Sequence, residues 1–260
     1  MREDAVGLEE ERLNQINTID DYQMVHERHR VFPYVFENRN HRKILDISAG
    51  VGVVARNILE NYETELVTNE MSPKCLKLLK AIGAKTVSFD LDNDKKAYPF
   101  SDGHFDAIVS LATIEHLIHI DHFIQEIYRM LNDNGYLYIS APNYSGLPYL
   151  LPFLLTGKTF HDPFSEKDKY EFYAHIRYFT YRTLAEFVSS FGFTLDTVYL
   201  PLPKESTNFR KIVQRSKIKA GILKGSMWFI YHLSPRWASE PVLCFSKNTS
   251  KKKNVRKIIL

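Results

Sequence analysis

The chain has few cysteines and no long apolar run. Its 260 residues include two cysteines, Cys75 and Cys244, which lie far apart and form no Cys-x-x-Cys pair. This argues against a disulfide framework and a zinc-ribbon site, and it fits a reducing cytoplasm. The most apolar stretch, Leu147–Leu155, contains two prolines and is far shorter than the ~20 residues of a membrane-spanning helix. The acidic, polar start of the chain also lacks the pattern of a signal peptide.

Charge is unevenly distributed along the chain. The formal net charge is +3, but Lys204–Leu260 contains fourteen Lys or Arg residues and two acids, so residues 1–203 carry about −9. A basic region suggests an anionic partner, such as a membrane surface, a phosphorylated acceptor or nucleic acid. A solvated basic face ending in the Lys251–Lys253 tail explains the same charges equally well.

Short apolar segments alternate with amphipathic ones through most of the chain. This alternation predicts a mostly parallel sheet with helices on both faces, an α/β fold. The predicted strands are Lys43–Ile47, Glu65–Asn69, Lys85–Phe89, Phe105–Leu111, Gly135–Ser140, Phe193–Leu200 and Val242–Ser246. The predicted helices are Val53–Asn61, Pro73–Ile82, Asp121–Leu131 and a segment that Thr180 caps and Gly192 ends.

Four further segments surround this core in one predicted domain. Residues 1–42 look like a polar helical cap, and residues 248–260 look like a basic tail. Residues 141–179 are rich in Pro and aromatic side chains without a clear period, and residues 204–239 are basic and aromatic. We interpret these two stretches as insertions near a site for the acceptor.

A glycine-containing turn follows the first predicted strand. Asp46–Gly52 reads DISAGVG, and glycines there let the backbone turn sharply and approach a ligand closely. Taken alone the signal is ambiguous. Gly50–Ala55 also satisfies the G-x-G-x-x-A dinucleotide pattern, and Glu70 lies about 20 residues further on.

Acidic residues favour a cationic cofactor over a dinucleotide. A carboxylate at Asp46 would repel a pyrophosphate, whereas it suits the cationic amino group of S-adenosylmethionine. Asp46 lies at the end of the first predicted strand, and Glu70 and Asp90 directly follow the second and third. Each acid alone is usually a cap or turn residue, but three at matched strand ends favour a binding site. No Tyr-x-x-x-Lys pair supports short-chain dehydrogenase chemistry.

With these segments the sequence resembles the class I S-adenosylmethionine-dependent methyltransferases, in the broad subgroup that modifies quinones, small molecules and glycans. The segments that carry the resemblance are KILDISAGVG, LVTNEMSP, SFDLDN, YPFSDGHFDAIVSLATIEHL and RMLNDNGYLYISAPN. The resemblance implies a Rossmann-like sheet of seven strands, the last antiparallel, with S-adenosyl-L-methionine across the strand tips.

The resemblance also implies the residues that hold the cofactor. The family loop is commonly D-x-G-x-G-x-G, and here Ser48 replaces the first glycine, so a non-catalytic relative that kept the fold stays an alternative. The residues carried over to the cofactor are Asp46, Ser48, Gly50, Gly52, Glu70, Asp90, Leu91 and Leu111.

Methyl transfer to a hydroxyl benefits from a base, and histidine serves near neutral pH. His116 follows the fourth predicted strand. The resemblance implies that this position faces the cofactor pocket, and we predict that His116 is catalytic. Capping of the next segment is the competing interpretation. Glu115, His116, His119, Asp121 and His122 match no zinc spacing, so we predict no metal site.

The acceptor site is expected after the fifth strand and in the insertion behind it. The candidate residues are Asn143, Tyr144, His161, Tyr173, His175 and Arg177, although such aromatics more often cover the core. The expected activity is O-methylation of a small-molecule, glycan or lipid-linked acceptor. The basic region suggests two further hypotheses. One is contact with an anionic membrane, because Lys217–Tyr231 combines basic with apolar residues. The other is nucleic-acid methylation, but the sequence lacks an Asn-Pro-Pro-Tyr-like motif, which argues against it.

Overall fold

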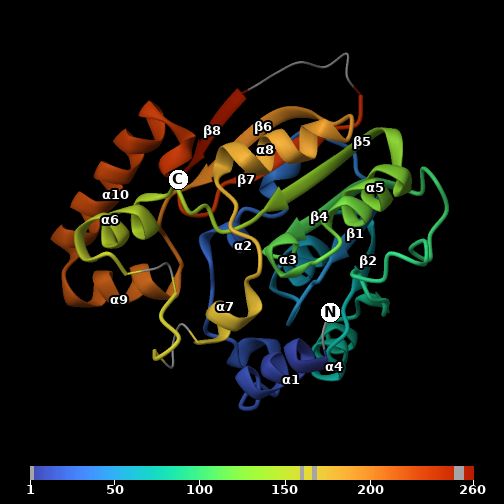
Figure 1. Cartoon of the computed structure of the whole chain (residues 1–260), viewed down its shortest axis with the longest axis horizontal. Helices are drawn as coiled ribbons and strands as arrows, with labels where there is room; N and C mark the ends of the chain where they lie inside the picture. Colours follow the sequence, from blue (N-terminus) through green and yellow to red (C-terminus); the bar gives the residue numbers. More distant parts are fainter. Residues whose placement is uncertain (1–2, 159–160, 166–168, 249–254) are drawn as a thin grey trace.

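The computed structural model describes residues 3–158, 161–165, 169–248 and 255–260 (Figure 1). The strands are β1 (Lys43–Ile47), β2 (Glu65–Asn69), β3 (Lys85–Val87), β4 (Phe105–Leu111), β5 (Leu131–Ser140), β6 (Thr194–Pro201), β7 (Val242–Ser246) and β8 (Val255–Ile259). The α-helices are α1 (Glu3–Arg12), α2 (Glu27–Arg30), α3 (Val53–Asn61), α4 (Pro73–Ala81), α5 (Ile120–Met130), α6 (Leu147–Thr156), α7 (Lys169–Ala174), α8 (Tyr181–Ser190), α9 (Thr207–Arg215) and α10 (Lys217–Leu233). The 3-10 helices are η1 (Ile19–Asp21), η2 (Tyr34–Phe36), η3 (Ile114–His116) and η4 (Pro235–Trp237).

The strands form one sheet in the order β3-β2-β1-β4-β5-β7-β6-β8. All neighbouring pairs are parallel except those of β7, which runs antiparallel to both β5 and β6. The strand order reverses between β1 and β4, and such a reversal opens a crevice beyond the carboxyl ends of the strands. The Rossmann-like α/β fold, with β7 antiparallel, is therefore confirmed.

Two apolar cores cover the two faces of the sheet. Successive side chains of a strand point to opposite faces, so Ile108 of β4 joins the core that includes Phe123 of α5 and Leu184 of α8. Its neighbour Val109 joins the core that includes Ala55 of α3. Figure 1 shows α5 and α8 in front of the sheet and α3 behind it. A sheet covered on both faces fixes the strand ends, and hence the site, rigidly.

Two expectations about the C-terminus are wrong. The sheet contains eight strands rather than seven, because β8 pairs in parallel with the edge of β6, from Thr197↔Val255 to Pro201↔Ile259. The supposed tail from residue 248 thus includes a strand, although Lys251–Lys253 lies outside the described residues. The segment VRKII was not predicted as a strand because Arg and Lys interrupt its apolar residues. Such charged residues suit an exposed edge strand.

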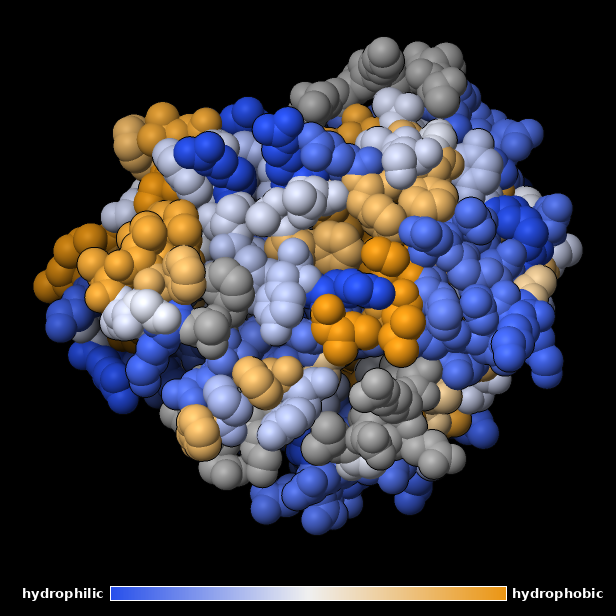
Figure 2. All heavy atoms as spheres, viewed as in Figure 1, coloured by the Kyte–Doolittle hydropathy of each residue, from blue (hydrophilic) through white to orange (hydrophobic). Residues whose placement is uncertain are grey.

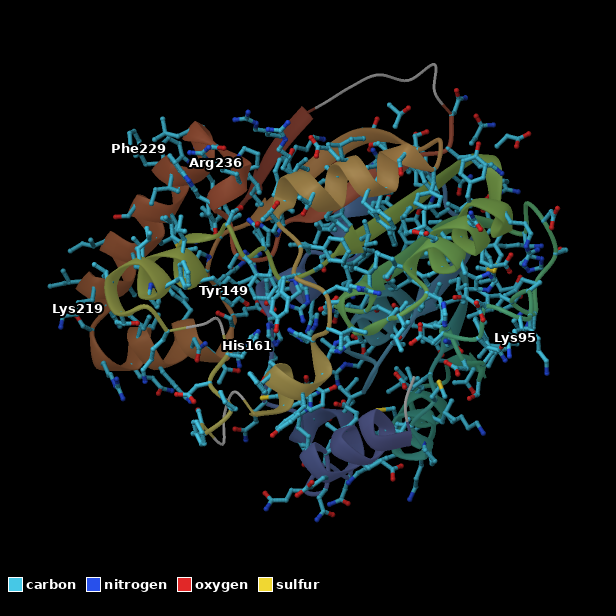
Figure 3. The ribbon with its side chains drawn as sticks, in the orientation of Figure 1. Lys95, Tyr149, His161, Lys219, Phe229 and Arg236 are labelled. Atoms are coloured by element: carbon cyan, nitrogen blue, oxygen red, sulfur yellow. The ribbon has the colours of Figure 1, made fainter. Side chains whose placement is uncertain are left out.

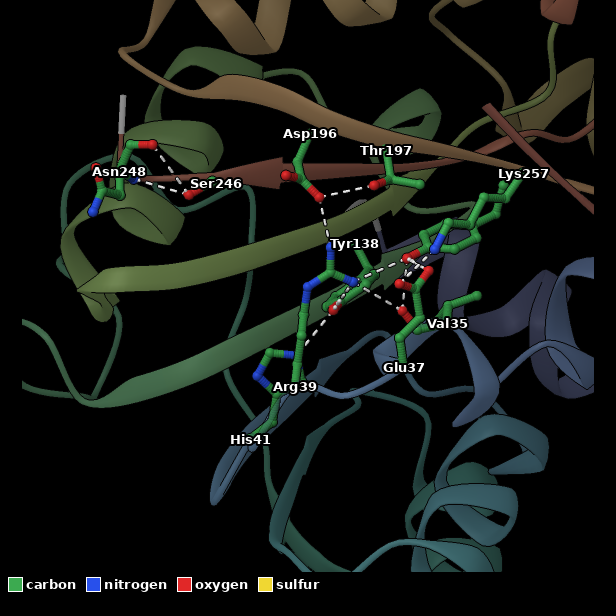
Figure 4. Close-up of polar contacts among 11 residues, drawn as sticks. Val35, Glu37, Arg39, His41, Tyr138, Asp196, Thr197, Ser246, Asn248 and Lys257 are labelled. Atoms are coloured by element: carbon green, nitrogen blue, oxygen red, sulfur yellow. Dashed lines mark hydrogen bonds and ion pairs between the residues drawn. The ribbon is translucent and has the colours of Figure 1, made fainter. Parts of the chain in front are cut away.

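The N-terminal segment is fastened to the far edge of the sheet through Arg39 (Figure 4). Its guanidinium forms an ion pair with Asp196 of β6 and donates to the hydroxyl of Tyr199 at 2.9 Å. Glu37 accepts from Tyr199 at 2.8 Å and forms an ion pair with Lys257 of β8 at 2.6 Å. These partly buried bonds hold residues 35–39 in place, so the preceding helices can close over the carboxyl ends of the strands.

Candidate functional site

A cavity of about 970 Å³ opens beyond the carboxyl ends of β1, β2 and β4. Its floor includes Asp46, Ser48, Gly50, Glu70 and Leu111. The walls come from the predicted N-terminal cap and the two predicted insertions. The cap contributes α1 and the residues of and around α2, and the insertions contribute the segments around α6 and α7 together with α9 and α10. The cap and both insertions therefore meet over the strand ends.

The glycine loop takes the shape that its sequence predicts. Ser48, Gly50 and Gly52 have φ angles of +54°, +55° and +94°, a left-handed region that strongly favours glycine. Ser48 therefore adopts the conformation that the family's glycine allows. Gly52 does not line the cavity, and a Cβ there would lie 2.9 Å from Cδ2 of Leu79, so this glycine lets α3 pack closely.

Asp46 lies at the end of β1 and is 3% exposed. Its Oδ2 atom is buried without a hydrogen-bond partner in the described structure. Burial, and secondarily the carboxylate of Glu70, raise the pKa of Asp46 from its ordinary value of 3.8 to about 8. A buried acceptor of this kind suits a cationic ligand group, and so the site fits the amino end of S-adenosylmethionine.

Glu70 follows β2 and ties the glycine loop to the next turn. Its Oε2 accepts from the backbone N–H of Gly50 at 2.9 Å, and its Oε1 accepts from those of Met71 and Ser72 at 2.7 and 3.2 Å. Burial raises its pKa against the lowering effect of these three donors. A carboxylate oxygen accepts more than one hydrogen bond, so Glu70 can still meet ribose hydroxyls.

The loop after β3 differs from the expected arrangement. Neither Asp90 nor Leu91 lines the cavity, whereas Asp92 does. Leu91 is a core residue whose carbonyl accepts from the hydroxyl of Tyr98 at 2.7 Å. Asp92 accepts from the backbone N–H groups of Ile118 and His119 at 2.8 and 2.9 Å, which joins this loop to the segment after β4.

Three of the candidate side chains beyond β4 converge in the cavity. Glu115 and His116 lie on η3, and His175 follows α7. The His116 and His175 ring centroids are 4.7 Å apart. Burial lowers the pKa of His116, and burial with the neighbouring His116 and His161 lowers that of His175 to about 3. Both rings are therefore neutral, and His116 faces the cavity that the glycine loop forms.

The remaining acceptor candidates divide into two groups. His161, Tyr173 and Arg177 line the cavity, as His175 does. Asn143 and Tyr144 do not line it. The hydroxyl of Tyr144 instead bridges Nε2 of His161 and Nδ1 of His175, at 2.9 and 3.0 Å, and Figure 3 shows His161 near Tyr149 on the insertion.

The amide of Asn143 is used within the protein. Its Nδ2 donates to the carbonyls of Arg236 and Ala238, and its Oδ1 accepts from Ser145 and Tyr181. These bonds fasten the two insertions to each other, and they favour a structural role for Asn143 over a contact with the acceptor.

A buried ion pair in the cavity wall was missed by the sequence reasoning. Arg28 of α2 contacts Glu240 at 2.6 Å, and Nδ1 of His26 contacts the same carboxylate at 3.2 Å. The Arg28 guanidinium, and secondarily the His26 ring, lower the pKa of Glu240 against its burial. Residues 28 and 240 lie too far apart in the chain for any local pattern to reveal this pair.

The fold and the site define a class I S-adenosylmethionine-dependent methyltransferase. A structure described as a possible histamine N-methyltransferase from Thermotoga maritima aligns with a TM-score of 0.61 at 15% identity, covering 94% of this chain and 100% of that chain. Phosphoethanolamine N-methyltransferase 2 of Haemonchus contortus, crystallised with S-adenosyl-L-methionine, aligns with a TM-score of 0.53 at 16% identity, covering 93% of this chain and 56% of that one.

The sequence matches the methyltransferase domain family over residues 16–198, and the chain belongs to this family. Ajmaline N-methyltransferase of Rauvolfia serpentina is 31% identical over 94 residues, which are 34% of this chain and 32% of that enzyme. The norajmaline enzyme of the same plant is 30% identical over 94 residues. The match thus spans about a third of these relatives. S-adenosyl-L-methionine is the cofactor.

Glu70→Gln should weaken cofactor binding. The substitution keeps the side chain's size but removes the charge that strengthens hydrogen bonds to ribose hydroxyls, each worth about 1.5–3 kcal/mol. We expect the Kd for S-adenosylhomocysteine, measured by calorimetry, to rise at least about tenfold. Glu65→Gln, at the exposed start of the same strand, is the matched control and should bind normally. An unchanged Kd for Glu70→Gln would contradict the assignment.

Asp46→Asn should stabilise the cofactor-free protein at alkaline pH. Because the pKa of Asp46 is raised to about 8, the folded state keeps a proton that the unfolded state releases between pH 4 and 8, so the free energy of unfolding falls as pH rises through this window. Asparagine avoids that loss, which is on the order of 1.4 kcal/mol per pKa unit. Thermal melts at pH 9 should show a higher Tm than wild type, and melts at pH 4 should not.

The same variant should lose affinity for the cofactor, because the carboxylate is absent. Asp133→Asn, on an exposed turn of β5, should change neither property. Equal melting temperatures of Asp46→Asn and wild type at pH 9 would show that the Asp46 carboxyl is not held protonated by its surroundings.

Proposed function

We propose that this methyltransferase methylates a hydroxyl oxygen of a small-molecule, glycan or lipid-linked acceptor, with His116 activating that hydroxyl. The observation that carries the proposal is the hydrogen bond of 3.1 Å between Nδ1 of His116 and the carbonyl of Ala174. A carbonyl only accepts, so Nδ1 holds the proton of the neutral ring. Nε2 is then unprotonated and can act on an acceptor in the cavity.

The reaction depends more on aligning the acceptor oxygen with the methyl group than on strong chemical activation of either reactant. S-adenosylmethionine supplies a methyl group on a sulfonium, which is already a good leaving group. His116 takes the hydroxyl proton as the oxygen–carbon bond forms and the sulfur–carbon bond breaks. The floor residues hold the donor side, while His161, Tyr173 and Arg177 line the acceptor side of the same cavity, so both reactants can be held in line.

N-methylation is the second candidate. The ajmaline and norajmaline relatives are named as N-methyltransferases, and Glu115 offers the cavity a carboxylate whose two oxygens have no hydrogen-bond partner in the described structure. Such a carboxylate suits a cationic amine. Mass spectrometry of the methylated product separates a methyl ether from a methylamine.

We also propose that the enzyme works peripherally at an anionic membrane, on its cytoplasmic side. Residues 206–239 contain seven Lys or Arg and no acid. Apolar side chains are exposed on α10 and also on α6, including Ile218 of α10 at 77% and Leu155 of α6 at 81%. Figure 2 shows apolar side chains gathered over α6 and α10, and Figure 3 places Lys219 and Phe229 on this end of the molecule.

The other sides of these helices line the cavity. Leu223, Met227 and Tyr231 of α10, Phe209 of α9 and Tyr149 of α6 face it. No helix in the described parts of the chain is long and apolar enough to cross a bilayer. A surface of cations and exposed apolar groups instead suits the headgroup region, and it would bring a lipid-linked acceptor to the wall of the cavity.

His116→Gln should abolish methyl transfer without loss of the cofactor. Removing the imidazole nitrogen that acts on the hydroxyl should lower the rate by about 10²–10⁴. The assay is transfer of label from S-adenosylmethionine to material in a native membrane extract, with the Kd for S-adenosylhomocysteine measured alongside. The control is His119→Gln, three residues along and exposed. Full activity of His116→Gln would refute the proposed role.

Replacing Lys217, Lys219 and Lys224 with Glu should release the protein from anionic membranes. Each lysine near the surface contributes about 1 kcal/mol of attraction, so co-sedimentation with phosphatidylserine vesicles should fall steeply and wild-type binding should weaken with salt. A triple change of Lys77, Lys80 and Lys95, on α4 and the loop after β3, is the control. A wild-type protein that stays in the supernatant at low salt would rule out the membrane proposal.

A further inference from the structure

Three metal-ligating side chains meet in the cavity wall. A carboxylate oxygen of Glu115 and one ring nitrogen each of His116 and His175 all lie within 4.8 Å of one another. In the sequence, the neighbours of Glu115 and His116 with side chains able to bind a metal are His119, Asp121 and His122. In the structure the third member of the cluster is instead His175, which lies almost 60 residues further along the chain.

Backbone hydrogen bonds fasten the two segments that carry the cluster. The carbonyl of Glu115 accepts from the N–H groups of Ile176 and Arg177 at 3.0 and 3.1 Å. The carbonyl of Ala174 is the partner of Nδ1 of His116. These three bonds bracket His175, so the three side chains are held together before any ligand arrives, as a metal site requires.

The orientation of both rings is also fixed by their second nitrogens. Nδ1 of His116 donates to a backbone carbonyl, which leaves Nε2 with its lone pair. Nδ1 of His175 contacts the hydroxyl of Tyr144, which also contacts Nε2 of His161. When this hydroxyl donates to His161, it accepts from Nδ1–H of His175, and Nε2 of His175 is then a second nitrogen able to bind a metal.

Glu115 supplies the independent observation. Its side chain is 0% exposed, and both carboxylate oxygens are buried without a hydrogen-bond partner in the described structure. Arg28, a nearby cation, is already paired with Glu240 at 2.6 Å. Burying a carboxylate without partners is costly. A bound cation would supply the missing partner.

We propose that Glu115, His116 and His175 bind a divalent first-row transition-metal ion whose open positions take the acceptor hydroxyl. Two imidazoles and a carboxylate with open positions are a catalytic zinc or iron ligand set, whereas magnesium and calcium prefer oxygen ligands. Tyr144 is the positioning residue, because its hydroxyl orients His175.

This inference rests on the proposed methylation of a hydroxyl, and it replaces the proposed role of His116 as the proton acceptor. With the ion bound, Nε2 of His116 is a ligand rather than a proton acceptor. The charge of the ion lowers the pKa of the bound hydroxyl, and its proton leaves to solvent. The oxygen then bonds to the methyl carbon as the sulfur–carbon bond breaks, so the products are the methyl ether, S-adenosylhomocysteine and one proton.

The test is a titration of the metal-free, tag-free full chain with Co²⁺, followed by its visible absorption, and with Zn²⁺, followed by calorimetry. We expect one ion per chain. The variants Glu115→Gln, His116→Gln and His175→Gln should each weaken binding at least tenfold, and Tyr144→Phe should weaken it less. His119→Gln and His122→Gln, in neighbouring positions outside the cluster, are matched controls and should bind as wild type does.

Thermal melts guard against a folding defect, because Zn²⁺ should raise the Tm of the wild type and of both controls but not of the three ligand variants. Absence of saturable Co²⁺ binding, or binding that the ligand variants retain, would overturn the inference. If His116→Gln loses methyl transfer while the wild type binds no metal, the metal site is refuted and the proposed function stands. If Co²⁺ binds at the cluster and no hydroxyl is methylated, the metal site stands and the proposed function is refuted.

Discussion

Two buried carboxylates without complete hydrogen bonding set the constraint on this site. Asp46 is the penultimate residue of β1, Glu115 lies on η3 after β4, and both line one cavity. Neither can ionise without a cost unless a cation comes close. The protein tolerates this cost because apolar cores on both faces of the sheet stabilise the fold that carries the two residues. The cost is offset when a cationic ligand binds, so the same feature that destabilises the empty protein selects its ligands.

The core of the fold could be predicted because its signals are local. Strands such as Lys43–Ile47 and Phe105–Leu111 and the helix Val53–Asn61 have the predicted bounds, since alternation of apolar segments and glycine turns sets them. The positive φ of Ser48 also follows from its place in the loop. By contrast, β8 carries cations within a short apolar pattern, and its pairing with β6 is a tertiary contact that no periodicity reports.

The site shows the same division between local and distant information. The residues after β1 and β2 could be chosen because strand ends are recognisable in the sequence. The partners of the residues beyond β4 could not be predicted. Glu115 is brought to His175 by backbone hydrogen bonds to Ile176 and Arg177, in a segment without a regular period. Arg28 pairs with Glu240, which lies near the other end of the chain. Asp92 lines the cavity where Asp90 and Leu91 were expected, and β3 ends at Val87, two residues before its predicted end at Phe89.

The two insertions act as one wall because Asn143 joins them. Its amide bonds both to Arg236 and Ala238 and to Ser145 and Tyr181, so the segment after α10 is tied directly to the segment that holds Tyr144. Tyr144 in turn contacts His161 and His175. The outer faces of α6 and α10 carry exposed apolar side chains, with basic side chains on α10, while their inner faces line the cavity. The proposed membrane contact and the proposed acceptor site therefore lie on opposite faces of the same helices.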